Sequence, residues 1–115
     1  MPDALLDMPL HPKRLQERGF NQSLEIAKVL ADKLKLPLLT HHSKRIKNTV
    51  PQAQLKLKDR AKNIKNAFTC EPLTGMRVAL VDDVMTSGAS LNELALTAKR
   101  AGAAEVQCWV LARTP

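Results

Sequence analysis

The chain of 115 residues carries 18 lysines and arginines against 11 aspartates and glutamates, a formal net charge of +7, and 44% of its residues are hydrophobic. This size and balance predict one folded domain over residues 1–115 and exclude a membrane span. Cys70 and Cys108 lie far apart in apolar stretches, which argues against a disulfide framework and predicts buried thiols in a reducing cytoplasm. An aromatic content of 3% without tyrosine disfavours a surface that stacks single-stranded bases.

The first third of the chain predicts two short strands around one helix. Residues 5–10 form the first expected strand, and a loop over 11–20 follows it. Apolar residues recur at helical spacing over 22–36, and Asn21 precedes them as an N-cap. Residues 38–41 predict the next strand.

The next segment, over residues 44–65, is strongly basic. Its charged side chains are Lys44, Arg45, Lys47, Lys56, Lys58, Arg60, Lys62 and Lys65 against the single acid Asp59. We expect a mobile insertion over about 43–66 that includes a short amphipathic helix at about 58–66. Such charge attracts polyanions, and both a pyrophosphate group and a nucleic-acid backbone satisfy it.

The second half predicts a strand, a helix and a strand in succession. Residues 68–71 suit an edge strand, and 77–82 suit a central strand because the run is apolar throughout. A helix is expected over 89–101, ending at Gly102, before a last strand over 106–111. This order is typical of a βαβ unit, so the predicted fold class is α/β, a parallel twisted sheet with flanking helices.

The most informative stretch is Arg-Val-Ala-Leu-Val-Asp-Asp-Val-Met-Thr-Ser-Gly-Ala-Ser over 77–90. Asp82 and Asp83 follow the apolar run, at the carboxyl end of the strand, where open α/β sheets bind ligands. The hydroxyls after them, Gly88 and the start of a helix predict that an anion binds there. The structural alternative, in which the two acids end a strand and Ser87 caps a helix, explains only part of this run.

This stretch resembles the phosphoribosyl-pyrophosphate (PRPP) signature of the type I phosphoribosyltransferases. The resemblance implies a Rossmann-like core of that type, with Mg²⁺ bound together with PRPP. It implies that the acidic pair holds the ribose hydroxyls and that the turn wraps the 5-phosphate. The residues so implied are Asp82, Asp83, Val84, Met85, Thr86, Ser87, Gly88, Ala89 and Ser90.

A second set of residues is similar to the competence protein F (ComF) group of phosphoribosyltransferase-like proteins. These residues are Pro9-Leu10-His11-Pro12-Lys13-Arg14-Leu15, Glu17-Arg18-Gly19-Phe20-Asn21-Gln22, Arg45, Thr49, Pro51-Gln52-Ala53, Leu55, Arg60, Asn63, Ala67-Phe68 and Leu111-Ala112-Arg113-Thr114. A cysteine-rich zinc ribbon usually precedes this region in the group, and the sequence does not contain one. The resemblance therefore implies no zinc site for this chain.

The resemblance also implies roles for the basic residues. Pyrophosphate is expected at the loop after the first strand, which offers His11, Lys13, Arg14 and Arg18. Arg45 and Arg60 lie where the family inserts its flexible catalytic loop and are candidates for closing over the leaving group, with a solvated basic face as the alternative. With Asp82 and Asp83 they form the candidate catalytic set; no direct metal ligand from the protein is predicted.

Three functions are open at this point. The first is a cytoplasmic transferase that moves a phosphoribosyl group from PRPP to an unidentified acceptor and releases pyrophosphate. The second is a non-catalytic module that senses PRPP or a nucleotide, and the third is a DNA-associated competence accessory protein that uses the basic face. The expected partners are PRPP or a related sugar phosphate, DNA or a protein of the competence machinery, and a second copy of the chain, but not a membrane.

Overall fold

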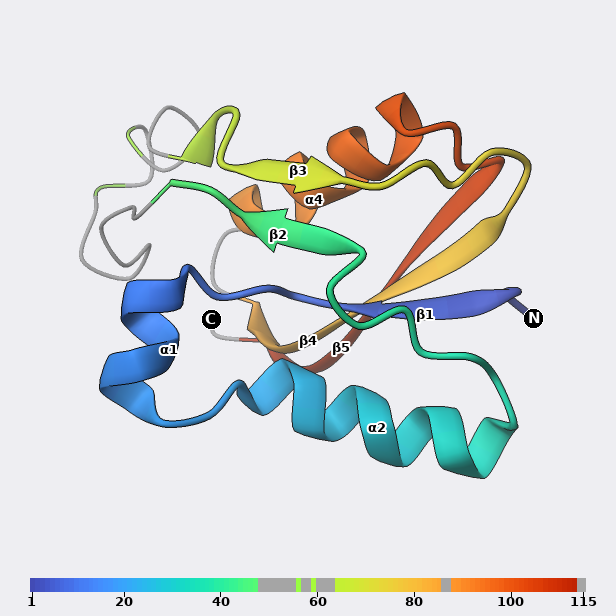
Figure 1. Cartoon of the computed structure of the whole chain (residues 1–115), viewed down its shortest axis with the longest axis horizontal. Coiled ribbons are helices and arrows are strands. Elements are labelled where there is room, and N and C mark those ends of the chain that lie inside the picture. Colours follow the sequence, from blue (N-terminus) through green and yellow to red (C-terminus); the bar gives the residue numbers. More distant parts are fainter. Residues whose placement is uncertain (48–55, 57–58, 60–63, 86–87, 114–115) are drawn as a thin grey trace.

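A three-stranded parallel sheet forms the centre of the computed structural model, which describes residues 1–47, 56, 59, 64–85 and 88–113. Its strands are β1 (Ala4–Asp7), β4 (Arg77–Met85) and β5 (Glu105–Arg113), in the order β1-β4-β5 (Figure 1). Helix α2 (Gln22–Leu34) lies on one side of the sheet and α4 (Ala89–Arg100) on the other. This arrangement confirms the predicted α/β class.

The central strand is apolar because both of its faces are covered. Val78 and Leu80 belong to the core cluster on the α4 side, whereas Ala79 and Val81 pack in the cluster that contains Ala27 of α2. These four residues of the nine in β4 are each at most 1% exposed. Alternating residues therefore serve opposite layers, as expected for a buried parallel strand.

The helices predicted over 22–36 and 89–101 are present, and their ends lie within two residues of the predicted ones. The side chain of Asn21 accepts a hydrogen bond from the Leu24 amide at 3.2 Å and so caps α2, as predicted. Gly102, with φ 103°, follows the last turn of α4, and a Cβ there would meet the Thr74 Cα at 3.1 Å. The predicted glycine thus provides both the backbone angle and the space for the chain to turn back.

The predicted loop over 11–20 is wrong, because residues Pro12–Arg18 form helix α1. Proline at the first helical position lacks only an N–H that would be unsatisfied there, and its fixed φ favours helix initiation. The His11 side chain accepts a hydrogen bond from the Lys13 amide at 3.2 Å, and Gly19 ends the helix in the left-handed region.

Two strand predictions also change. The first strand ends at Asp7, not at residue 10, and residues 38–41 contribute a single parallel bridge, Leu5 to Leu38. The expected mobile insertion begins as a strand, since β2 (Ser43–Arg45) pairs antiparallel with β3 (Phe68–Cys70). The local sequence of β2 is polar, and its pairing partner lies more than twenty residues away, so no local pattern indicated it.

Most of the helix predicted at about 58–66 lies outside the described residues; Asp59 and Ile64, which are described, are both helical. The prediction of two buried thiols is wrong: Cys108 is exposed on β5, and Cys70 on β3 is only half-buried. In the described part of the chain, none of the helices has the length and hydropathy needed to cross a bilayer.

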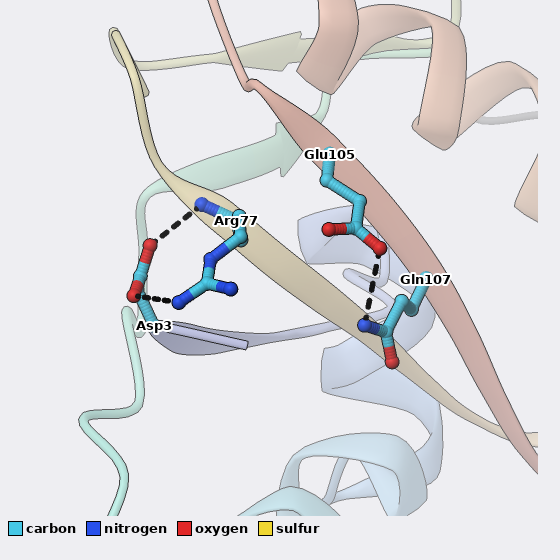
Figure 2. A network of polar contacts seen from close by, with 4 residues as sticks. All are labelled: Asp3, Arg77, Glu105 and Gln107. Atoms are coloured by element: carbon cyan, nitrogen blue, oxygen red, sulfur yellow. Dashed lines mark hydrogen bonds and ion pairs between the residues drawn. The ribbon is translucent and has the colours of Figure 1, made fainter. Parts of the chain in front are cut away.

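Figure 2 shows how the amino ends of β1 and β4 are joined. The Asp3 carboxylate accepts hydrogen bonds from the Arg77 amide at 2.9 Å and from Arg77 Nη2 at 3.3 Å. In return, the Asp3 amide donates to the Arg77 carbonyl at 2.7 Å. The hydrogen bond from the Arg77 backbone, together with that from its side chain, lowers the pKa of Asp3 below its ordinary value of 3.8.

An Asp3→Asn variant is expected to be slightly less stable than the wild type at pH 7, because it lacks the carboxylate that Arg77 contacts. A lowered pKa stabilises the fold above the unfolded-state pKa and loses this effect as pH falls through the folded value. The difference between the two proteins should therefore begin to shrink near pH 3.8 and vanish only below the lowered folded-state pKa. Urea unfolding at pH 7 and pH 3 measures it; an equal difference at both values would contradict the assignment.

Candidate functional site

Asp82 and Asp83 lie in the last part of β4, which runs on to Met85 rather than ending at residue 82. Asp82 is only 8% exposed. Its Oδ1 accepts hydrogen bonds from the Asp83 amide at 2.9 Å and from the Ser23 hydroxyl at 3.0 Å. The same hydroxyl lies 3.5 Å from Asp83 Oδ1. Ser23, in the first turn of α2, therefore joins the two carboxylates.

Burial raises the pKa of Asp82 from 3.8 to about 6. The neighbouring Asp83 side chain contributes to this rise, whereas the Ser23 hydroxyl opposes it by donating to the carboxylate. A carboxylate of this kind gains from any ligand that donates hydrogen bonds or brings positive charge. Ribose hydroxyls and a metal ion both meet this requirement.

The predicted phosphate loop is described in part. Val84 and Met85 pair with Ala112 and Arg113 in the sheet, while Thr86 and Ser87 lie outside the described residues. Gly88 is the N-cap of α4, with φ 82° and ψ 0°, and its carbonyl accepts from the Asn92 amide at 2.8 Å.

This left-handed backbone leads directly into Ala89 and Ser90, the first residues of a 12-residue helix. The positive end of the helix dipole therefore lies next to the carboxylate strand, where an anion is favoured.

Arg45 joins this site from β2. Its guanidinium carbon lies 5.3 Å from the centroid of the Phe68 ring, and the side chain interacts electrostatically with both Asp82 and Arg14. Burial lowers the pKa of Arg45, Arg14 adds to that effect, and Asp82 opposes it. The structure thus brings Arg45 close to both Asp82 and Arg14, and Arg60 lies outside the described residues.

The other predicted pyrophosphate residues lie on α1 or at its start. His11 caps the helix through its own side chain. Lys13 and Arg18 are exposed, and the Arg18 guanidinium carbon lies 6.0 Å from the Phe20 ring centroid. Contact between these side chains and pyrophosphate stays a prediction. The side chains belong to helix α1 and its N-cap, and not to a loop as predicted.

Sequence reasoning missed Ser23 and Asp7. Asp7 ends β1 and is 8% exposed, and the Asn21 amide group donates to its Oδ2 at 3.3 Å and to the Met8 carbonyl at 3.0 Å. Like Asp82, Asp7 follows an apolar run at the carboxyl end of a parallel strand, so the sequence carried a signal for it. Ser23 gave no such signal, since a serine in the first helical turn is usually a local feature.

A cavity of about 720 Å³ lies beside these residues, between the end of β1, helix α1, the start of α2 and strand β2. It is lined by Asp7, Pro9, Leu10, His11, Pro12, Leu15, Gly19, Phe20, Asn21, Leu24, Glu25, Thr40, His41, Ser43, Lys44, Arg45 and Ile46. Among the residues that the structure describes, no three or more histidine, cysteine, aspartate or glutamate side chains gather as a metal site.

Residues 21–115 match the phosphoribosyl transferase domain model. The chain belongs to the phosphoribosyl transferase domain family. A solved structure, the purine phosphoribosyltransferase from Pyrococcus horikoshii Ot3, shares the fold with a TM-score of 0.58 at 19% identity, over 99% of this chain and 71% of that one. The predicted type I phosphoribosyltransferase core is therefore confirmed.

This phosphoribosyltransferase-family chain is also similar to curated proteins. It is 40% identical over 117 residues to competence protein F of Haemophilus influenzae, across 98% of this chain and 51% of that protein. It is 38% identical over 115 residues to the DNA utilization protein YhgH of Escherichia coli K12, across 99% and 51%. The predicted resemblance to competence protein F is thus confirmed, and the chain spans about half the length of the curated relatives that it matches.

Proposed function

We propose that this domain binds PRPP together with Mg²⁺ at the carboxyl end of β4, in the cytoplasm, and transfers its phosphoribosyl group to an acceptor with release of pyrophosphate. One observation carries the proposal. The chain belongs to this family, and Asp82 and Asp83 lie side by side in the last part of the central strand. Gly88, with a left-handed backbone conformation, then precedes the first turn of α4.

The residues suit the parts of this ligand. Asp82 and Asp83 offer acceptors to two ribose hydroxyls, and the start of α4 offers a positive dipole to the 5-phosphate. Arg45, which interacts electrostatically with Asp82, supplies a cation suited to pyrophosphate oxygens. Mg²⁺ prefers oxygen ligands, which the two carboxylates and the phosphates provide, and it would neutralise charge on the leaving group.

In the proposed reaction, the bond between ribose C1 and the pyrophosphate oxygen breaks, and its electron pair leaves with pyrophosphate. A nitrogen of the acceptor forms the new bond to C1 with its lone pair, and the proton that this nitrogen carried passes to solvent. Positive charge develops on the ribose ring between these events. The acidic pair, held by Ser23, provides fixed negative charge near that ring.

Calorimetric titration with PRPP, with and without Mg²⁺, tests the binding step. We expect affinity in the micromolar range with Mg²⁺ and a loss of about tenfold or more without it, since the metal offsets repulsion between the carboxylates and the phosphates. Ribose 5-phosphate is a matched probe for the sugar and 5-phosphate contacts alone. Absence of PRPP binding under both conditions would refute the proposal.

Pyrophosphate release with a panel of nitrogen acceptors then separates a transferase from the alternative, a module that senses PRPP or a nucleotide. Release above the background without acceptor supports transfer. Tight PRPP binding without release by any acceptor supports sensing.

A second candidate, a DNA-associated role, is supported by the names of the relatives and by exposed lysines. In the basic segment over 44–65, the exposed lysines among the described residues are Lys44, Lys47, Lys56 and Lys65. DNA affinity measured against salt tests it, because neutralised phosphates give a linear fall of log affinity with log salt. A flat response would dismiss this role.

A further inference from the structure

The two edges of the parallel sheet differ in length and in cover. Strand β1 forms one edge over four residues, and the chain after α2 covers it: the Leu5 amide donates to the Pro37 carbonyl and the Leu39 amide to the Leu5 carbonyl, both at 2.9 Å. Strand β5 forms the other edge over nine residues. Within the described part of the chain, the backbone of β5 is hydrogen-bonded to β4 alone. Alternate residues of β5 therefore direct N–H and C=O groups outward along a continuous edge.

The sequence of β5 has none of the residues that commonly protect such an edge. Residues 105–113 include no proline, glycine or lysine. Val106, Trp109 and Val110 are strong strand formers, and Leu111 is 73% exposed. This edge is therefore suited to pairing with a further strand.

The side chains on one face of β5 are ordered along the strand. The Trp109 indole donates to Gln107 Oε1 at 3.1 Å, and Gln107 Nε2 donates to Glu105 Oε1 at 3.5 Å, the contact drawn in Figure 2. This is the face toward α2, because Ala79 and Val81, which pack on the α2 side, lie opposite Gln107 and Trp109. A partner that met this row would fix little additional side-chain freedom.

A second copy of the same strand fits this edge. Trp109 is the middle residue of β5, so antiparallel pairing about a two-fold axis at Trp109 keeps all nine residues paired. Gln107 then faces Leu111 of the second copy, and Glu105 faces position 113, where the sequence has an arginine. An acidic and a basic residue of the sequence thus meet at each end of the pair. Nine residue pairs give about eight to ten backbone hydrogen bonds, a usual number for a specific interface.

Apolar side chains near the axis add to this fit. The two Trp109 side chains lie opposite each other, and cross-strand aromatic pairs stabilise antiparallel strands. Helix α4 packs on β5 from the other face, and a two-fold axis normal to the sheet places both copies of α4 on that same face. Leu96, near the middle of α4, is 43% exposed. Pairing along β5 would therefore shield apolar surface on both faces of the sheet.

We propose that two copies of this chain associate through β5, edge to edge and antiparallel about Trp109, so that their parallel sheets join into one continuous sheet. The interface lies on β5 and not on the residues assigned to PRPP. Its test is therefore independent of the proposed function.

Sedimentation equilibrium under reducing conditions tests the association, because a reductant prevents disulfide formation through Cys108, which is exposed on β5. We expect a reversible equilibrium between monomer and dimer with a dissociation constant in the micromolar range. A chain that stays monomeric up to about 1 mM would overturn the proposal.

Paired substitutions at Gln107 and Leu111 test the register. Within one strand these positions are about 13 Å apart, whereas the pairing places each opposite the other in the second copy. Gln107→Lys with Leu111→Lys sets like charges opposite each other twice and should weaken the dimer about tenfold or more. Gln107→Lys with Leu111→Glu sets opposite charges there and should keep the dissociation constant within about threefold of the wild type. Dimerisation of the second variant would show that both positions tolerate substitution, and equal behaviour of the two variants would overturn the proposal.

The control is Gln16→Lys with Val29→Lys, which adds the same charge at exposed positions on α1 and α2. It should dimerise like the wild type, and a loss equal to that of the variant with two lysines on β5 would contradict pairing through this strand. Amide exchange measured by NMR locates the interface. Alternate amides of residues 106–111 should exchange more slowly at high than at low protein concentration, while those of β1 do not change. A dimer without this protection would overturn the proposal.

Discussion

Replacing Asp82 and Asp83 together by asparagine is expected to weaken the binding of PRPP with Mg²⁺ at least a hundredfold. Hydrogen bonds to a charged group contribute about 1.5–3 kcal/mol each, and the variant loses two charged acceptors for the ribose hydroxyls. It also loses the negative charge that attracts the metal ion. Calorimetric titration at pH 7.5 measures the change.

The loss should not reflect unfolding. Because burial raises the pKa of Asp82 from 3.8 to about 6, the folded state binds its proton more tightly than the unfolded state does. The resulting stabilisation is complete below the unfolded-state pKa and is lost as pH rises through about 6. At pH 7.5 the ionised carboxylate is thus a cost to folding, and the double variant should be at least as stable as the wild type in urea.

A charge-matched control uses Asp32→Asn with Glu105→Gln, two exposed positions on α2 and at the start of β5. This variant should bind PRPP with Mg²⁺ like the wild type. If the Asp82 and Asp83 variant also binds normally, the sugar does not contact these carboxylates.

Ser23→Ala is expected to weaken PRPP binding about tenfold at pH 6.5 and little at pH 8.5. The Ser23 hydroxyl donates to Asp82 Oδ1 at 3.0 Å and thereby lowers the pKa of Asp82 against the effect of burial. Without this donor the pKa of Asp82 should move upward from about 6, so that more of the carboxyl is protonated near neutral pH. A protonated carboxyl is a weaker acceptor for ribose hydroxyls.

The pH profile separates this positioning role from a structural one. Titration from pH 5.5 to 8.5 should show the midpoint of binding displaced to higher pH in the variant, with convergence at the alkaline end. Thr97→Ala, which removes a hydroxyl bonded to the Glu93 carbonyl on α4, is the control and should leave the midpoint unchanged. An equal loss of affinity at every pH would show that Ser23 acts on the fold alone.

The sheet and its two covering helices could be predicted because their signals are local. The uninterrupted apolar run of β4, the helical spacing after Asn21 and the glycine after α4 each reflect a property of a few neighbouring residues. Helix α1 had a local signal as well, proline at its first position, although a loop was predicted there. Strand β2 had none, since its pairing with β3 depends on distant residues.

The sequence by itself determined the family, the α/β class and the acidic pair followed by a glycine turn, because these depend on residue order along one strand and its following turn. Only the tertiary structure decided that Ser23 holds Asp82, that Arg45 interacts with Asp82 and with Arg14, and that Asp7 and Asn21 border a cavity. These residues come from different elements, and the docking of α2 and β2 around the carboxyl ends of the parallel strands brings them together. Such docking depends on burial summed over the whole core, which no local pattern encodes.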